Sequence, residues 1–223
     1  MDNFVFWHYI VSILIGYLLG SSSMSYYISK IKKIDLKNNG SKNYGTSNTF
    51  ALIGKKAGVA VFIHDFLKSM IAVVLVEFLF PNSMYASVIA GCFVIIGHIF
   101  PFYLKFDGGK GFASYIGLGF ALFPLPALVV LIIAMLAAFI CDYMVVATCS
   151  FLITIPIIAI LKGDWFVTIL LILISCIIAW KHKDNFVNLI TKNGKEMKIK
   201  SAFSKKYKVR ENAPTIKDTE MSK

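Results

Sequence analysis

The sequence predicts an all-α integral membrane protein with about seven transmembrane helices, its amino terminus outside and its carboxyl terminus in the cytoplasm. Of its 223 residues, 57% are hydrophobic, and the mean hydropathy is +0.72. Both values are too high for a soluble domain. The apolar residues form runs of about 20 residues, the length a helix needs to cross a bilayer. Finally, lysines gather between alternate runs and after the last one.

The first predicted helix covers residues 4–28. The chain begins with Asp2 and has no basic residue before Lys30, which is unlike the basic start of a cleavable signal peptide. Five lysines then follow within a short distance, and an excess of lysine marks the cytoplasmic side of a membrane. They are Lys30, Lys32, Lys33, Lys37 and Lys42.

Six further helices follow from the remaining apolar runs. A turn without basic residues, Pro81-Asn82-Ser83, is expected outside, and the prolines Pro124 and Pro126 mark a second external turn. Residues 162–164 form the last outer turn. The predicted helices cover residues 57–80, 84–100, about 115–123, 127–140, 143–161 and 165–180.

The net charge of +11 follows from membrane topology. Only Lys68 and Lys162, among 23 lysines and arginines, fall outside the predicted cytoplasmic segments. No basic face is interleaved with aromatic residues, so nucleic acid is not expected as a partner. We expect one membrane domain over residues 1–196 and a basic, flexible cytoplasmic tail over residues 197–223.

Three polar segments lie on the predicted cytoplasmic face. The first polar segment (residues 40–48, GSKNYGTSN) offers hydroxyl, amide and backbone groups suited to a small anionic substrate, although a solvated loop is the plain alternative. The second (residues 105–114, KFDGGKGFAS) leads into a helix, so free amides and the Lys110 ammonium could form a phosphate cradle. It lacks the spacing of a Walker loop. With the third (residues 181–185, KHKDN), they predict a site at the membrane surface.

Ionisable residues also occur inside the second predicted helix. Asp65 and Lys68 are three residues apart, which allows an ion pair, and a buried charge in a membrane segment is equally a functional candidate. His98, near the end of the third helix, is either a general base or a packing residue. His8 has no evident polar neighbours, and we assign it no role. The four cysteines lie in apolar runs without paired spacing, which favours packing over metal or disulfide chemistry.

Together these motifs resemble the bacterial acyl-phosphate:glycerol-3-phosphate acyltransferase family. The resemblance covers about residues 12–196, in the right order and on one membrane face. It rests on the motifs Gly20-Ser21, Asp35, GSKNYGTSN, GKKAG at 54–58, Asp65 and Lys68, GHIFPFYLKFDGGKGFAS, and HKDN with Gly194 and Glu196.

The resemblance implies a multi-pass enzyme of the bacterial cell membrane with a cytoplasmic active face. Such an enzyme transfers a fatty acyl group from acyl phosphate to the 1-hydroxyl of glycerol 3-phosphate, which yields lysophosphatidic acid for phospholipid synthesis. No metal or organic cofactor is implied, and the expected partners are the two substrates and membrane lipids. The oligomeric state is not predicted.

Site residues are carried over from the family by position. The implied catalytic residues are Ser41, Lys110, His182 and Asn185. The implied substrate-binding residues are Lys37, Gly40, Lys42, Asn43, Ser47, Asn48, Gly108, Gly109 and Gly111.

The chain is a diverged member by the same comparison. Lysine replaces the family's arginine at Lys37 and its glycine at Lys42, and Ala51 stands where an arginine is usual. Lys183 and Asn188 also replace arginines. Lysine lacks the rigid bidentate fork of arginine, so phosphate handling is the property affected. Two hypotheses stay open: an active acyltransferase, or a catalytically weak homologue that acts as a binding or scaffold protein. A transporter is a distant third, because it would be expected to show internal repeats and midplane polar residues, and apart from His64, Asp65 and Lys68 the midplane is apolar.

Overall fold

The computed structural model describes residues 2–190, and every regular element in that range is a helix. The predicted all-α class is confirmed for these residues. The predicted tail at 197–223 lies outside them. The elements are α1 (Asp2–Ser21), α2 (Met24–Lys32), α3 (Thr46–Leu52), α4 (Lys55–Leu79), α5 (Ala86–Ile99), the 3-10 helix η1 (Phe102–Leu104), α6 (Phe112–Leu122), α7 (Pro124–Cys141), α8 (Met144–Leu161), α9 (Trp165–Lys181) and α10 (Lys183–Ile190).

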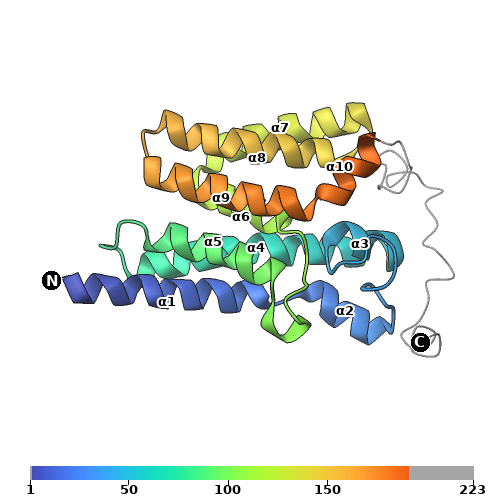
Figure 1. Ribbon diagram of the computed structural model, residues 1–223, viewed down its shortest axis with the longest axis horizontal. Coiled ribbons are helices and arrows are strands. Elements are labelled where there is room, and N and C mark those ends of the chain that lie inside the picture. The colour runs from blue at the N-terminus through green and yellow to red at the C-terminus, as the bar shows by residue number, and fades with distance from the viewer. Residues whose placement is uncertain (1, 191–223) are drawn as a thin grey trace.

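The long helices lie side by side in two layers (Figure 1). One layer contains α1, α4 and α5, and the other contains α7, α8 and α9. The short helix α6 lies between the layers and packs against α4 on one side and against α7 and α8 on the other. The bundle thus places the ends of α4, α5, α6 and α9 close enough for their connecting segments to meet.

Within the described part of the chain, five helical stretches are long and apolar enough to cross a membrane. They are Phe6–Lys32, Lys55–Leu79, Ala86–Leu104, Pro124–Cys141 and Met144–Leu161. Two shorter apolar helices are Phe112–Leu122 and Trp165–Lys181. Each of the seven predicted segments overlaps one of these stretches. That all seven cross the membrane, and in which direction, stays a prediction.

The first predicted helix is in fact two helices. α1 ends at Ser21 and α2 begins at Met24, where the chain turns extended at Ser23 (φ −129°, ψ 98°). The Ser23 hydroxyl accepts a hydrogen bond from the Tyr26 amide (3.3 Å), so it caps the new helix. A run of three serines at the junction supplies hydroxyls that compete with the helical backbone bonds, which is why hydropathy alone missed the break.

The prolines Pro124 and Pro126 do not form the predicted turn. α6 ends at Leu122, and Phe123 alone links it to α7, which starts at Pro124. Proline suits the first turn of a helix, because its missing N–H would have no partner there. The fifth predicted helix therefore begins three residues earlier than expected.

Glycines let α1 and α5 approach at backbone distance. A Cβ atom at Gly16 would lie 2.2 Å from the Ala90 carbonyl oxygen, and one at Gly97 would lie 2.3 Å from that of Tyr17. Small residues of this kind allow helices to pack closely where no hydrophobic driving force acts between them. The close contact fixes the level of the α1–α2 junction against the end of α5.

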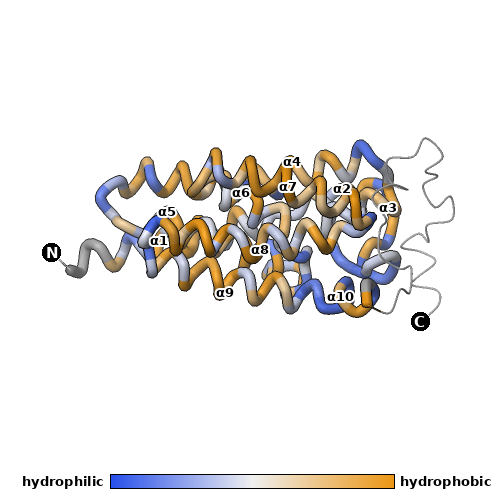
Figure 2. The backbone as a smooth tube through the Cα atoms, turned by 90° about the horizontal axis from the view of Figure 1, so that it is seen from above, coloured by the Kyte–Doolittle hydropathy of each residue, from blue (hydrophilic) through white to orange (hydrophobic). Residues whose placement is uncertain are grey.

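Hydropathy divides the bundle along its long axis. Figure 2 shows hydrophobic residues along the middle and hydrophilic segments at the ends, with α2, α3 and α10 at the end opposite the amino terminus. α7 in particular turns large apolar side chains outward, among them Ile133, Leu136 and Ile140. Apolar surface of this extent is expected for a protein embedded in a membrane.

Candidate active site

The first polar segment folds around one amide side chain, that of Asn48 in the first turn of α3. Its Oδ1 accepts a hydrogen bond from the Ser41 amide (2.9 Å). Its Nδ2 donates to the carbonyls of Leu36 (2.8 Å), Asn39 (3.2 Å) and Asn43 (2.9 Å). The side chain is buried. Asn48 was predicted to bind substrate, but its side-chain amide forms hydrogen bonds that hold the loop together.

Asn43 donates hydrogen bonds to Ser41, which fixes the role of the Ser41 hydroxyl oxygen as an acceptor. Asn43 Nδ2 donates to the Ser41 carbonyl (2.7 Å) and to the Ser41 hydroxyl oxygen (3.0 Å). Asn43 is buried, whereas Ser41 is exposed. Because the hydroxyl oxygen accepts from Asn43, the hydroxyl proton is available to donate outward. Ser47, the other predicted hydroxyl, is exposed on α3.

Two residues of this segment have a left-handed backbone. Gly40 has φ +63°, and a Cβ atom there would lie 2.2 Å from Asn48 Oδ1. Glycine is therefore required at this position for the loop to pack against Asn48. Lys42 has φ +53° with a side chain present, a conformation that costs about 1–2 kcal/mol. The family's glycine at this position has a physical reason, and Lys42 adds an exposed cation at the cost of that strain.

The glycines of the second polar segment pack against the end of α5. The Gly108 amide donates to the Ile99 carbonyl (3.0 Å), and the Gly109 amide donates to the His98 carbonyl (3.1 Å). Cβ atoms at these glycines would lie 2.2 Å from His98 O and 2.1 Å from His98 Nε2, respectively. The predicted cradle of free amides is therefore wrong for Gly108 and Gly109. Gly111, with φ +87°, turns the chain into α6.

Lys110 meets two residues from the carboxyl end of α9 and the start of α10. Its Nζ donates to Asn185 Oδ1, and its charge also acts on the imidazole of His182. The structure therefore brings together three of the four residues predicted to be catalytic. The sequence predicted a polar segment at residues 181–185 and roles for His182 and Asn185, but it did not predict the short helix α10.

His182 lies just beyond α9 and is buried. Its Nδ1 lies 2.8 Å from the Ile178 carbonyl oxygen. A carbonyl only accepts, so Nδ1 carries the proton and Nε2 has a lone pair. Burial lowers the pKa of His182 to about 4, with a further lowering from the Lys110 ammonium and a partly offsetting rise from the bond to Ile178. His182 is therefore neutral at pH 7.

A cluster of charges joins all three polar regions of the chain. Lys37 Nζ, just before the first segment, forms an ion pair with Asp107 of the second. Lys181 Nζ of the third segment lies 3.6 Å from the other carboxylate oxygen of Asp107. The sequence pointed to Lys37 but missed both partners. Their positions next to the GGKG and HKDN motifs were the available signal.

The first and second polar segments also meet through their backbones. The Tyr44 amide donates to the Gly108 carbonyl (3.4 Å), and the Tyr44 ring packs edge-on against Tyr26 of α2 at 5.6 Å. Burial, with the charge of Asp35, raises the pKa of the Tyr44 phenol, so it stays neutral. The predicted residues thus form two clusters, Ser41 with Asn43 and Lys110 with His182 and Asn185, which the Tyr44 and Lys37 contacts hold at the same end of the bundle.

The ionisable residues of α4 form the predicted ion pair. Lys68 Nζ lies 2.9 Å from Asp65 Oδ1, and both side chains are buried. Lys68 also donates to the backbone carbonyl of Gly20 (2.9 Å) at the α1–α2 junction.

His8 was expected to have no polar neighbours, and this expectation is corrected. Its Nδ1 hydrogen-bonds to the Ser83 hydroxyl, and its ring stacks on Phe80 at 4.4 Å.

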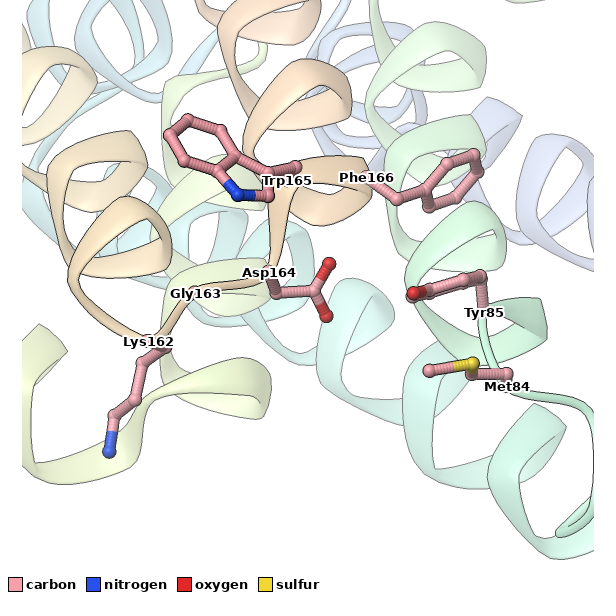
Figure 3. A pocket seen from close by; sticks show the side chains of 7 residues that line it. All are labelled: Met84, Tyr85, Lys162, Gly163, Asp164, Trp165 and Phe166. Carbon is pink, nitrogen blue, oxygen red and sulfur yellow. The ribbon is translucent and has the colours of Figure 1, made fainter.

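A pocket of about 410 Å³ lies at the turns between α4 and α5 and between α8 and α9. None of the predicted site residues lines it. Figure 3 shows the Asp164 carboxylate facing the pocket while Lys162 points away. Asp164 accepts a hydrogen bond from the Val167 amide (3.0 Å), so it caps α9. Helix capping accounts for its position. The lining residues are Met84, Tyr85, Lys162, Gly163, Asp164, Trp165 and Phe166.

Within residues 2–190, no group of three or more histidine, cysteine or acidic side chains is arranged to hold a metal ion. The four cysteines, all within the described residues, form no disulfide. The chemistry on which this site can be argued is that of lysines, an imidazole, amides and a hydroxyl.

The fold and the site define a helical membrane protein whose lysine-rich polar segments meet at one end of the bundle. Residues 10–192 match the family model described as glycerol-3-phosphate acyltransferase. The chain belongs to that family, as the sequence motifs predicted.

Relatives and solved structures agree with this assignment. The glycerol-3-phosphate acyltransferase of Endomicrobium trichonymphae is 36% identical over 199 residues, which cover 88% of this chain and 98% of the relative. That of Listeria monocytogenes serotype 4a is 33% identical and covers 84% of this chain and 94% of the relative. Among structures, the glycerol 3-phosphate form of PlsY (YgiH), an integral membrane glycerol 3-phosphate acyltransferase, is similar with a TM-score of 0.79 at 30% identity, covering 87% of this chain and 98% of that one.

Proposed function

We propose that this chain is an acyl-phosphate-dependent glycerol-3-phosphate acyltransferase that makes lysophosphatidic acid. The observation that carries the proposal is the meeting of Lys110, His182 and Asn185 from two distant motifs. Family membership supplies the reaction class. The solved PlsY structures are described as glycerol 3-phosphate and lysophosphatidic acid forms, which are the acceptor and the product we propose here.

The reaction joins two phosphate-bearing substrates. The 1-hydroxyl oxygen of glycerol 3-phosphate attacks the acyl carbonyl carbon, the bond between that carbon and the phosphate oxygen breaks, and inorganic phosphate leaves. Negative charge develops on the carbonyl oxygen and on the leaving phosphate, so positioned cations and hydrogen-bond donors are what the reaction requires. Lys110 is the cation best placed, with Lys37 and Lys42 near the first segment.

His182 is suited to orient the acceptor hydroxyl. Its Nε2 lone pair can accept the hydroxyl hydrogen bond, because the Ile178 carbonyl fixes the proton on Nδ1. With a pKa of about 4 the imidazole is a weak base. The proton therefore passes to the leaving phosphate, because the oxygen freed from the acyl carbon is a stronger base than this imidazole.

Ser41 and the lysines complete the proposed roles. The Ser41 hydroxyl, oriented by Asn43, donates to a substrate phosphate or to the acyl carbonyl. Lys37 shares Asp107 with Lys181, so substrate phosphate would compete with that carboxylate for both cations. Such an exchange is inexpensive, because partly exposed ion pairs contribute about 0–1 kcal/mol.

The proposed setting is the bacterial cell membrane, with seven crossings and the active face in the cytoplasm. The support is the bias of lysine toward the end of the bundle that holds α2, α3 and α10. The acyl donor would reach this face from the inner leaflet or the cytoplasm. No cofactor takes part in the proposed chemistry.

The alternative, a catalytically weak scaffold, rests on one substitution. Ala51 lies on α3 and supplies no charge where the family has an arginine. The contacts among Lys110, His182 and Asn185 favour the enzyme, since a scaffold has no chemical need of them.

A donor comparison tests the proposal. Purified protein in detergent is given glycerol 3-phosphate with palmitoyl phosphate, palmitoyl-coenzyme A or palmitoyl-acyl carrier protein, and lysophosphatidic acid is measured by mass spectrometry. Of the three donors, we expect only palmitoyl phosphate to give lysophosphatidic acid. Product from a thioester donor instead would refute the acyl-phosphate assignment, and no product from any donor would favour the scaffold.

A further inference from the structure

A cluster of buried charges contacts the α1–α2 junction and the second polar segment, and it has no place in the chemistry above. It consists of Asp65 and Lys68 on α4 and His98 at the end of α5, with exposed fractions of 2%, 5% and 6%. Ionisable groups inside a membrane bundle are costly to bury, and a hydrophobic set of similar volume would hold helices together at least as well. The cluster therefore calls for a reason beyond packing.

Lys68 is the centre of the cluster. Its three N–H groups face four acceptors: the carbonyls of Gly20 (2.9 Å) and Ser22 (3.0 Å), Asp65 Oδ1 (2.9 Å) and His98 Nδ1 (2.9 Å). The same Nδ1 also lies 3.4 Å from Asp65 Oδ1, which can only accept. Because the Lys68 ammonium is nearer, at 2.9 Å, and can only donate, we assign Nδ1 of His98 as the acceptor and place the ring proton on Nε2. Lys68 thus fixes both the orientation and the tautomer of His98.

His98 in turn touches the second polar segment twice. Its carbonyl accepts the Gly109 amide (3.1 Å). The Nε2 edge of its ring lies against Gly109 so closely that a Cβ atom there would be 2.1 Å away. Gly109 directly precedes Lys110, so the position of the His98 ring limits where Lys110 can lie.

The cluster also reaches the first polar segment. The carbonyls of Gly20 and Ser22, which Lys68 holds, flank the break between α1 and α2. On α2, the Ser25 hydroxyl hydrogen-bonds to that of Thr49 (2.7 Å), and both side chains are buried. Thr49 follows Asn48, the residue around which the first segment folds.

We propose that Lys68 and His98 are positioning residues that hold the Gly109–Lys110 backbone at the place where Lys110 meets Asn185. His98 acts through its Nδ1 bond to Lys68, which keeps the ring against Gly109. The inference builds on the proposed acyltransferase, and it assigns to these residues no contact with substrate.

Two substitutions of His98 separate this role from its alternatives. In His98→Asn the side-chain amide lies near the place of Nδ1 and keeps a partner for Lys68. In His98→Gln it lies near the place of Nε2 instead and loses that partner. If His98 works through Lys68, His98→Asn keeps kcat within about fivefold of wild type, whereas His98→Gln loses tenfold or more, with KM for glycerol 3-phosphate little changed in both.

The same variants are compared by hydrogen–deuterium exchange at residues 106–112, which does not depend on activity. We expect faster exchange of the Gly109 amide in His98→Gln and in the neutral pair Asp65→Asn/Lys68→Met, and near wild-type exchange in His98→Asn. Glu77→Gln, which removes a charge from an exposed position on the same helix, is the matched control and should change neither readout.

The outcomes are distinct. If His98→Gln equals or exceeds His98→Asn in kcat and in Gly109 protection, the positioning role is wrong. The same holds if the neutral pair lowers the melting temperature while kcat and Gly109 exchange stay at wild-type values, since the cluster would then only stabilise the fold. An inactive wild type would defeat the proposed function and leave the exchange experiment to decide this inference.

Discussion

The two nitrogens of His182 have different surroundings, and the difference fixes what the residue can do. One faces the Ile178 carbonyl of its own helix, and the ring is buried near the Lys110 charge. A neutral ring with one free lone pair suits orientation of a hydroxyl better than full proton abstraction. The motif supplied the identity of this residue. Its tautomer and its charge state follow only from the turn at the end of α9.

The low pKa of His182 predicts a pH-dependent loss of stability. Well above pH 6.5 the residue is neutral in both folded and unfolded chains. As the pH falls from there toward 4, the unfolded chain binds a proton that the folded chain resists, so stability falls, by on the order of 3 kcal/mol once the pH is below the folded pKa. His182→Asn keeps a donor for the Ile178 carbonyl but cannot titrate, and we expect its melting temperature to depend less on pH between 4 and 6.5. Parallel curves for the two proteins would contradict this.

Lys42 combines a charge with a strained backbone, and the two effects can be separated. Lys42→Gly removes both the cation and the strain at φ +53°, whereas Lys42→Asn removes the cation and keeps a residue that tolerates this conformation. If Lys42 compensates for the arginine missing at Ala51, both variants raise KM for glycerol 3-phosphate, by about tenfold, and Ala51→Arg helps only when Lys42 is gone. We expect Lys42→Gly to be the more stable of the two. Unchanged kinetics in both variants would remove Lys42 from substrate binding.

At the scale of elements, prediction from the sequence succeeded for long apolar runs and failed for short polar helices. The seven apolar segments correspond to helices because the apolar runs and their polar borders are unambiguous. α3 and α10 were missed because neither has an apolar run, and tertiary contacts hold them. The break at Ser22 and Ser23 was missed because hydropathy does not register a change of direction. The motifs located Gly108 and Gly109. They could not show that the amides of these glycines donate to carbonyls at the end of α5, because that contact is tertiary.

We expect Asn48 to hold the fold of the first polar segment and not to contact the substrate. Asn48→Asp removes the donors to Leu36, Asn39 and Asn43 and sets a carboxylate against those carbonyls, so the loop should open. We expect faster hydrogen–deuterium exchange over residues 36–48 and at least a tenfold loss of kcat/KM. Ser47→Ala, at the exposed neighbouring position, is the control and should not change the exchange. Wild-type exchange in Asn48→Asp would mean that the loop is held by other contacts.

At the scale of the whole molecule, the two-layer bundle brings separate motifs to one end. Lys37, Asp107 and Lys181 come from connections before α3, before α6 and at the end of α9, and only their common end of the bundle brings them together. Sequence order could indicate a shared face but not a shared ion pair. The same end must face the cytoplasm if phosphorylated substrates made in the cell are to reach it.

Cysteine accessibility tests that orientation. In a chain with its four cysteines replaced by alanine, Lys162→Cys lies at a predicted outer turn and Ser47→Cys at the proposed active face. A membrane-impermeant maleimide added to intact cells should label Lys162→Cys, and it should label Ser47→Cys only after permeabilisation. Labelling of Ser47→Cys in intact cells would reverse the orientation.

The central claim is that Lys110, with Asn185 and His182, serves acyl transfer to glycerol 3-phosphate. The most direct measurement is the initial rate of lysophosphatidic acid formation from palmitoyl phosphate by wild type, Lys110→Met and the control Lys105→Met, with folding checked by melting temperature. Lys105 lies in the same segment and is exposed. We predict an active wild type, a Lys105→Met rate within about threefold of it, and a loss in Lys110→Met of roughly 30- to 5,000-fold, equivalent to roughly 2–5 kcal/mol. A folded Lys110→Met protein with wild-type turnover, or a wild type without product, would contradict the claim.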